Sequence, residues 1–208
     1  MTIPYGPILV VEDIPNILDL LQMTLTFKGY PVNTARDGEE ALAKIEEERP
    51  SLIITDVLMP KLDGFSLTHR LRNNPLTRDI PVVMISATYI GPEDKAFARR
   101  LGAVQFLEKP VDTNKFLLTV AELLTQGPPP LPEPLSDQEF FQGYRERLEE
   151  KLQQKNKQIN RTKRLLESLP KEQVATFEAL LEEELTHRAS IQKDLDDLYK
   201  IMQDAEDH

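Results

Sequence analysis

Five short apolar runs, each followed by an amphipathic stretch, limit the N-terminal part of the chain to one class of fold. The runs cover residues 8–11, 32–35, 51–56, 81–86 and 104–107. Short strands that alternate with helices are typical of a parallel sheet with helices on both faces. The sequence therefore predicts an α/β domain with a five-stranded, parallel, doubly wound sheet.

The helical stretches between these runs repeat their apolar residues every three or four positions. The predicted buried face of the first helix, residues 16–28, consists of Ile17, Leu20, Leu21 and Leu25. Asp37 and Asp112 precede the second and the fifth helix. Because a carboxylate there can accept hydrogen bonds from free backbone N–H groups, we expect both aspartates to cap helices.

A proline-rich segment separates this domain from the rest of the chain. Residues 127–134 have the sequence Gly-Pro-Pro-Pro-Leu-Pro-Glu-Pro. Proline lacks a backbone N–H and fixes φ, so the segment favours an extended spacer over a helix or a paired strand. The sequence predicts a domain at 1–126, a linker at 127–135 and a second module at 136–208.

The second module has the heptad pattern of two long amphipathic helices. The first helix carries Leu148, Leu152, Ile159, Leu166 and Leu169 at core positions. The second carries Val174, Phe177, Leu181, Ile191, Leu195, Leu198 and Met202. Ser168 as a cap and Pro170 in the first turn of the second helix favour a bend near residues 168–171. We expect a helical hairpin or coiled coil, and a single kinked rod is the alternative.

Charge in this module also favours a hairpin. Residues 151–164 contain six Lys or Arg and no Asp or Glu. A bend would place them beside Glu178, Glu182, Glu183 and Glu184, so we expect ion pairs across the hairpin. Two helices bury little surface alone, whereas two copies would form a four-helix bundle. The sequence therefore predicts a homodimer formed through residues 136–208.

Composition argues against several kinds of site. The chain has no cysteine, which excludes disulfides, thiolate nucleophiles and cysteine metal ligands. No stretch approaches the roughly 20 apolar residues that cross a bilayer, and the N-terminus lacks the pattern of a secretory signal. We expect a cytoplasmic protein. The net charge of −10 argues against nucleic-acid binding by the whole protein.

Polar residues follow four of the predicted strands. Glu12 and Asp13 follow the first strand, Asp56 and Ser86 end the third and the fourth, and Lys109 follows the fifth. Ligands of doubly wound sheets bind at the carboxyl ends of the strands, so these side chains should meet. Converging carboxylates need a cation, and Mg²⁺ accepts carboxylates together with phosphate oxygens. We predict that Asp56 attacks phosphorus, with Mg²⁺, Lys109 and Ser86 each serving one phosphoryl oxygen.

Four motifs in this order make residues 6–126 resemble the receiver domain of two-component response regulators. They are Val-Val-Glu-Asp at 10–13, Asp-Val-Leu-Met-Pro at 56–60 with Asp-Gly at 63–64, Ser-Ala-Thr at 86–88, and Glu-Lys-Pro at 108–110. The resemblance implies a flavodoxin-like sheet of strand order 2-1-3-4-5. It also implies that a cognate histidine kinase or phosphotransfer protein phosphorylates Asp56. Such a chain would be a signalling receiver rather than an enzyme acting on other substrates.

The resemblance also implies roles for single residues. Mg²⁺ would be held by Asp13, Asp56 and the backbone carbonyl of Leu58, with Glu12 acting through water. Lys109 would pair with the phosphoryl group, and the Lys109–Pro110 peptide bond would be cis. Ser86 and Phe106 would form the switch. Two positions depart from the commonest pattern of the family, which has Asp at position 12 and Tyr at position 106.

Several alternatives stay open. Thr88 offers a hydroxyl that competes with Ser86, and Phe106 could simply pack in the core. The helical module could dock another protein or bind DNA. The chain could also be a relay intermediate that passes phosphate to a histidine, either His187 or one on another protein. The helices are long for a helix-turn-helix, and the residues around His187 match no phosphotransfer pattern, so a switched dimerisation or docking module is favoured.

Overall fold

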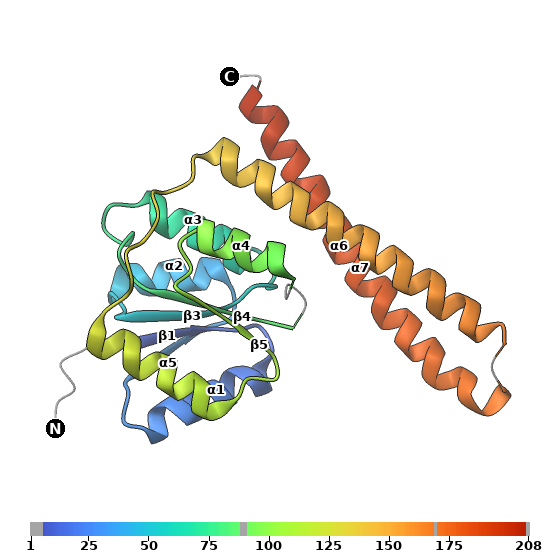
Figure 1. Ribbon diagram of the computed structural model, residues 1–208, viewed down its shortest axis with the longest axis horizontal. Helices are drawn as coiled ribbons and strands as arrows, with labels where there is room; N and C mark the ends of the chain where they lie inside the picture. The colour runs from blue at the N-terminus through green and yellow to red at the C-terminus, as the bar shows by residue number, and fades with distance from the viewer. Residues whose placement is uncertain (1–5, 88–90, 169, 207–208) are drawn as a thin grey trace. The chain divides into compact units, whose positions relative to one another are not determined.

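The computed structural model describes residues 6–87, 91–168 and 170–206 (Figure 1). The chain divides into two compact units, Met1–Ser136 and Asp137–His208. We call them the receiver unit and the helical unit and describe each by itself. Within the described ranges, no helix combines the length and the apolar character that crossing a membrane requires.

The receiver unit is built on one parallel sheet. Its strands are β1 (Ile8–Val11), β2 (Val32–Ala35), β3 (Leu52–Asp56), β4 (Val82–Ser86) and β5 (Gln105–Glu108). They lie in the order β2-β1-β3-β4-β5, and every neighbouring pair is parallel. The predicted doubly wound sheet and its order 2-1-3-4-5 are confirmed.

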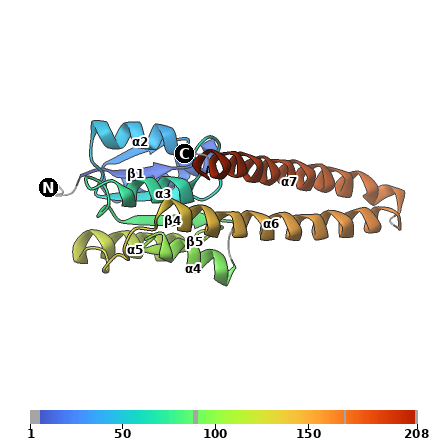
Figure 2. The ribbon, with the colours of Figure 1, turned by 90° about the horizontal axis from the view of Figure 1, so that it is seen from above.

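Five helices cover the two faces of this sheet (Figures 1 and 2). They are α1 (Pro15–Phe27), α2 (Gly38–Glu47), α3 (Gly64–Asn73), α4 (Pro92–Arg100) and α5 (Thr113–Gln126). One face carries α1 and α5, whose buried residues join those of the strands in one apolar cluster. The strands β1, β3 and β4 are buried along their whole length, which explains why their sequences are nearly continuous apolar runs.

Aspartates cap the N-termini of three of these helices. Asp37 accepts hydrogen bonds from the backbone N–H groups of Glu39 and Glu40, and Asp112 accepts one from Lys115. Asp63 caps α3 in the same way. The two predicted caps are therefore confirmed.

The predicted buried face of α1 is wrong at one position. Leu20 is 64% exposed, whereas Leu18, Leu21 and Leu25 are buried. The run Ile17-Leu18-Asp19-Leu20-Leu21 offers apolar residues on several faces, so periodicity alone does not fix the rotation of the helix. Packing against β1 and α5 selects the face that contains Leu18.

The helical unit is a hairpin of α6 (Asp137–Leu166) and α7 (Lys171–Glu206), not a kinked rod. Arg188 Nε donates to Asn156 Oδ1 at 2.7 Å, and Tyr199 Oη donates to Glu149 Oε1 at 2.7 Å. From the first bond to the second, the position on α6 falls from 156 to 149 while that on α7 rises from 188 to 199, so the two helices run antiparallel. Pro170 lies one position before α7 rather than inside its first turn. Leu169 lies outside the described residues.

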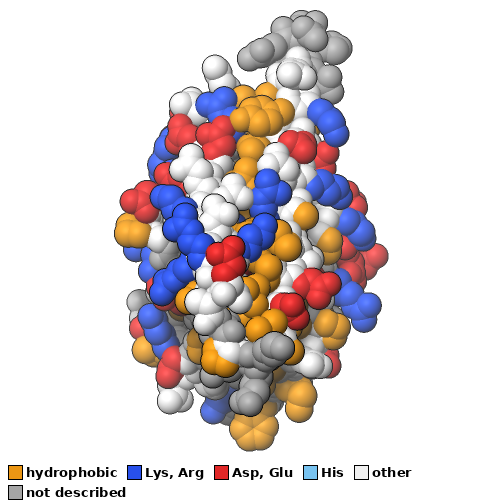
Figure 3. Space-filling model, turned by 90° about the vertical axis from the view of Figure 1, so that its right-hand side faces the viewer, with side chains coloured by type: hydrophobic (Ala, Val, Ile, Leu, Met, Phe, Trp, Pro, Cys, Tyr) orange, Lys and Arg blue, Asp and Glu red, His pale blue; other side chains and the backbone are white. Residues whose placement is uncertain are grey.

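The seam between α6 and α7 follows most of the predicted heptads, but Lys151 is buried where Leu152 was predicted, and Leu152 and Val174 are only half-buried. The seam residues are Leu148, Lys151, Lys155, Ile159, Thr162 and Leu166 on α6, and Phe177, Leu181, Glu184, Arg188, Ile191, Leu195, Leu198 and Met202 on α7. Residues 191, 195 and 198 are buried, but Phe177 and Leu181 nearer the bend are only half-buried. Figure 3 shows hydrophobic side chains in a band along the hairpin, flanked by charged ones. Toward the bend, the apolar residues of α7 are therefore less buried than Ile159 and Thr162 of α6.

The expected neutralisation of the basic stretch by the glutamates of α7 is wrong for the outer residues. Lys157, Arg161 and Arg164 are spaced by four and three residues, so they share a face of α6 that points away from α7. Neither they nor Glu182 and Glu183 form an ion pair with any described residue. Helix rotation, which the charge pattern did not specify, prevents the contact.

We predict that Gly102→Ala destabilises the receiver unit by about 1–3 kcal/mol. Gly102 has φ +93, and a Cβ there would lie 2.6 Å from Arg72 Nε. Arg72 is buried and donates to the backbone oxygens of Ile80 and Gly102, both at 2.9 Å, so it cannot move aside freely. Urea unfolding monitored by circular dichroism would measure the loss.

Gly127→Ala is the matched control. Gly127 also has a positive φ, +77, but nothing lies within 4 Å of the added Cβ. Its substitution should cost only the backbone strain. Equal losses in the two variants would contradict a packing role for the contact between Gly102 and Arg72.

Candidate functional site

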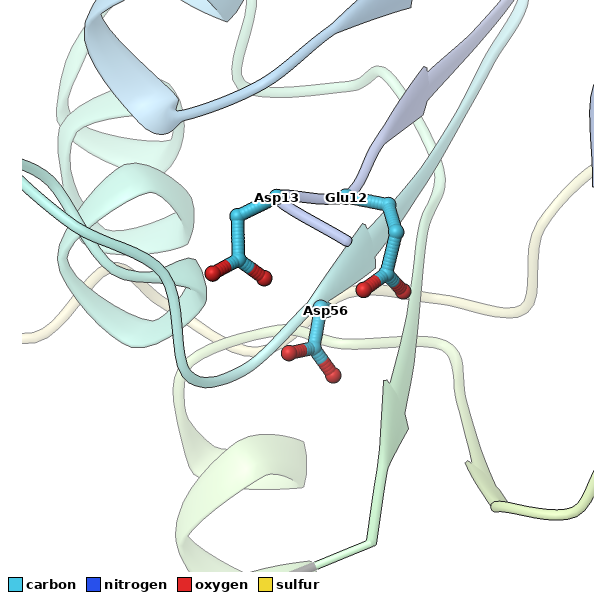
Figure 4. Close-up of side chains that lie close together, drawn as sticks. All are labelled: Glu12, Asp13 and Asp56. Atoms are coloured by element: carbon cyan, nitrogen blue, oxygen red, sulfur yellow. The ribbon is translucent and has the colours of Figure 1, made fainter. Parts of the chain in front are cut away.

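Three carboxylates converge at the carboxyl edge of the sheet. Glu12 and Asp13 follow β1, and Asp56 is the last residue of β3, the strand beside β1. One ligand oxygen of each residue lies within 4.8 Å of the others, and Figure 4 shows the carboxyl groups around a common space. Glu12 is 1% exposed and Asp56 8%, while Asp13 is half-buried. Sheet topology therefore brings together the acidic residues that the sequence predicted.

Lys109 reaches the same point from the end of β5. Its Nζ lies 2.8 Å from Glu12 Oε2 and 3.0 Å from Asp56 Oδ1. Burial alone would lower the pKa of Lys109, but the charge of Asp56 and the contact with Glu12 raise it above the usual value. Lys109 is thus a fixed positive charge that bridges two carboxylates.

The environment of Asp56 is unusual for a carboxylate. Burial raises its pKa from 3.8 to about 6; Lys109 opposes the increase and Glu12 adds to it. One ammonium group does not balance three carboxylates, so the site has room for a further cation. The donors of Glu12, Asp13 and Asp56 are all oxygens, as Mg²⁺ requires, so these residues could hold the ion. A contribution of the Leu58 carbonyl stays a prediction.

Ser86 and Phe106 lie near this edge on the next two strands. Ser86 ends β4, is 1% exposed, and accepts a hydrogen bond at its backbone oxygen from Lys109 N at 2.9 Å. Phe106 pairs with Met84 across β4 and β5 and is half-buried. Thr88, the competing hydroxyl, lies outside the described residues. The Lys109–Pro110 peptide bond is cis, the geometry that the resemblance implies.

Glycines allow the loop after β3 to pass close to the site. Gly64 N donates to the Val57 oxygen at 2.9 Å, and a Cβ on Gly64 would lie 2.2 Å from the Asp56 oxygen. Against the same loop, a Cβ on Gly38, the first residue of α2, would lie 2.6 Å from the Leu62 oxygen. Both positions exclude any side chain.

Sequence reasoning missed a second anchor of this loop. Lys61 Nζ lies 2.7 Å from Asp37 Oδ2, and Lys61 adopts the left-handed region with φ 63. Gly38 N also donates to the Leu62 oxygen at 2.9 Å. The loop that carries Leu58 is therefore tied to the N-terminus of α2. A glycine directly after the cap Asp37 was the available signal.

A family model matches more than half of this chain. Residues 8–121 fit the response regulator receiver domain, a segment that contains every site residue described above. The match ends before the linker and leaves the helical unit unassigned.

Curated relatives are similar over the same part. Response regulator PleD of Caulobacter vibrioides is 45% identical over 56% of this chain, and the alignment covers 25% of its own length. The regulatory protein PhoP of Bacillus subtilis is 41% identical over 58% of this chain and 49% of its own. The chain thus spans between a quarter and about half of these relatives. An uncharacterised 14.6 kDa protein of Leptolyngbya boryana is 38% identical, with 97% of its length covered.

Solved structures agree with these matches. Chemotaxis response regulator CheY4 of Vibrio cholerae superposes with a TM-score of 0.54 at 34% identity, covering 57% of this chain and 98% of that one. The receiver domain of NtrX from Brucella abortus gives a TM-score of 0.52 at 34% identity, covering 56% and 97%. The chain belongs to the response regulator family and carries its receiver domain at residues 8–121.

Proposed function

We propose that the chain is a phosphorylation-controlled switch that accepts a phosphoryl group on Asp56 in a Mg²⁺-dependent reaction. The donor would be a histidine kinase or a phosphotransfer protein. The observation that supports this most directly is the position of Lys109 Nζ, 3.0 Å from Asp56 Oδ1 within the carboxylate cluster. The cytoplasmic location expected from the composition stays a prediction.

The chemistry follows from the side chains at the sheet edge. An Asp56 carboxylate oxygen attacks phosphorus, the donor's N–P bond breaks, and an acyl phosphate forms. The Lys109 ammonium moves from carboxylate oxygen to phosphoryl oxygen, and the Ser86 hydroxyl donates to another oxygen. A Mg²⁺ ion held by Asp13 and Asp56 would supply positive charge to the phosphoryl oxygens. We do not expect turnover of any other substrate.

The output step in this proposal begins with Ser86 and Phe106. Movement of the Ser86 hydroxyl toward the phosphoryl group frees space behind it, and Phe106 turns inward to fill that space. Phe106 is half-buried on β5 and thus has room for such a change. In this way a charge added at Asp56 alters the surface formed by α4, β5 and α5.

We propose homodimerisation through the helical unit as the output. Phe177 and Leu181 in the seam remain half-buried, and four apolar side chains stay between 40% and 50% exposed: Leu165, Leu180, Leu185 and Ile201. A two-helix hairpin is too small to cover them. A second copy would complete a four-helix core.

The two alternatives lack a comparable observation. His187 is an exposed residue of α7, as expected for a surface histidine, and nothing around it suggests phosphotransfer. RpaA of Synechocystis, 40% identical over 56% of this chain, is described as a DNA-binding transcriptional regulator, but the alignment covers only 48% of its length. The two helices of 30 and 36 residues favour a coiled hairpin over a helix-turn-helix.

The proposed phosphorylation of Asp56 can be tested directly. The full chain with Mg²⁺ and a small acyl phosphate donor should gain one alkali-labile, hydroxylamine-sensitive phosphoryl group, detected by intact mass spectrometry. Asp56→Asn should gain none. Asp79→Asn makes the same charge change at the opposite edge of the sheet and should react normally. Modification of Asp56→Asn at the wild-type rate would refute the assignment.

The buried charge of Asp56 predicts a pH-dependent stability. Its folded pKa, about 6, exceeds the unfolded value of 3.8, so the stability contributed by Asp56 falls as the pH rises between these values. Without divalent cations, Asp56→Asn should therefore be more stable than the wild type at about pH 7.5, by roughly 1–3 kcal/mol. The difference should shrink toward about pH 4.

Thermal unfolding at both pH values measures this effect, and added Mg²⁺ supplies a control. The ion should raise the melting temperature of the wild type more than that of Asp56→Asn, because bound ligand stabilises the folded state. A stability difference independent of both pH and Mg²⁺ would show that Asp56 carries no unbalanced charge.

The oligomeric state of the full chain tests the proposed homodimerisation. Sedimentation velocity at tens of micromolar should give a dimer, and a beryllofluoride mimic of the phosphoryl group should change the monomer–dimer equilibrium. Asp56→Asn should dimerise but not respond to the mimic. A monomer under all these conditions would reject the homodimer.

A further inference from the structure

Two leucines near the bend of the hairpin are exposed on one face. Leu165 is 40% exposed and Leu180 43%. Each lies one position before a seam residue, Leu166 or Leu181. In an antiparallel pair of helices, residues rotated from the seam in the same sense lie on the same face, at about 100° per residue. Leu165 and Leu180 therefore share a face.

Opposite charges lie on the same face. Arg161 precedes the seam residue Thr162, and Glu183 precedes Glu184, so both are rotated from the seam like the two leucines. Arg161 and Glu183 are exposed, and neither forms an ion pair with a described residue. We call the set Arg161, Leu165, Leu180 and Glu183 the tip face. It has a basic residue on α6, an acidic residue on α7 and leucines on both.

The partners on this face lie at equal heights along the hairpin. The hydrogen bond from Arg188 to Asn156 fixes the register of the two helices. Arg161 and Glu183 lie five residues from this contact toward the bend, each on its own helix. Leu165 and Leu180 lie nine and eight residues from it. On the tip face, the residues of α6 thus lie level with those of α7, and the charged residues of the two helices have opposite signs.

This inference rests on the homodimer proposed above and specifies its geometry. We propose that the tip face binds the tip face of a second copy, with the two hairpins parallel and a two-fold axis along them. That axis places α6 of one subunit on α7 of the other without changing height. Arg161 then meets Glu183 of the partner subunit, and Leu165 meets Leu180 of the partner subunit. Each contact occurs twice because the interface is isologous.

Charge discriminates against the other two-fold arrangement. An axis across the hairpin would place α6 on α6 and α7 on α7. The basic stretch at 151–164 would then face itself, as would the glutamates Glu182 and Glu183. Like charges placed against one another oppose association, so the charge pattern selects the parallel pair.

Disulfide trapping tests this arrangement, because the chain contains no cysteine of its own. Leu165→Cys and Leu180→Cys chains of different tagged mass are mixed and oxidised mildly. We expect a disulfide between the two different variants and little between identical ones. Cysteine replaces each leucine with a small apolar group, and circular dichroism would check that the hairpin is retained.

Charge exchange gives a second readout. Arg161→Glu and Glu183→Arg should each weaken self-association by about tenfold or more, since each reverses two contacts in the dimer. Mixing the two variants restores opposite charges at both contacts and should recover wild-type association. Lys163→Glu also reverses an exposed positive charge, but Lys163 follows the seam residue Thr162 and so lies on the opposite face; it serves as the control, with a smaller effect.

The outcomes distinguish the parallel tip-face pairing from the homodimer on which it rests. A dimer that forms disulfides between Leu165→Cys chains alone, or none at all, overturns the parallel tip-face pairing and leaves the homodimer standing. A dimer whose association is unaffected by Arg161→Glu also overturns the pairing. A wild-type chain that stays monomeric overturns both.

Discussion

The balance between Lys109 and the carboxylates of Glu12 and Asp56 is the interaction on which the receiver unit's site depends. Lys109 Nζ contacts both groups within 3.0 Å, in surroundings that exclude most solvent. Low exposure makes each charge expensive to leave unpaired, and one ammonium cannot balance three acids. The site therefore keeps an excess of negative charge. In the function proposed above, a divalent cation and a phosphoryl group would complete the site.

The backbone around the site is as restricted as its charges. Gly38 and Gly64 each approach a carbonyl oxygen so closely that no side chain fits. Lys61 and Asp37 hold the intervening loop from outside. These contacts fix the loop that carries Leu58, and they connect its position to the N-terminus of α2. The position of Leu58, a proposed metal ligand, thus depends on Gly38, Gly64, Lys61 and Asp37, which have no proposed ligand role.

The helical unit is less completely packed, because Phe177 and Leu181 of α7 near the bend are only half-buried. The buried seam residues include Leu148, Ile159 and Thr162 on α6 and Ile191, Leu195 and Leu198 on α7. Polar seam residues such as Lys155 and Glu184 lower stability but restrict the register in which helices can pair. In the homodimer proposed above, a partner would bury the remaining apolar surface and stabilise the module. A module of this kind would suit the proposed regulation by the receiver unit.

The sequence by itself determined the strand pattern, the linker, the capping aspartates and the identity of the acidic site, because each rests on local periodicity or on residues at strand ends. Because all the strands are parallel and these residues lie at their carboxyl ends, Glu12, Asp56 and Lys109 meet at one edge of the sheet. Tertiary structure alone decided the rotation of α1, which buries Leu18 and exposes Leu20. It also turned Arg161 away from the glutamates of α7 and brought Lys61 to Asp37. Helix rotation and loop anchoring depend on contacts between residues distant in sequence. The periodicity of apolar residues along the chain does not reveal such contacts.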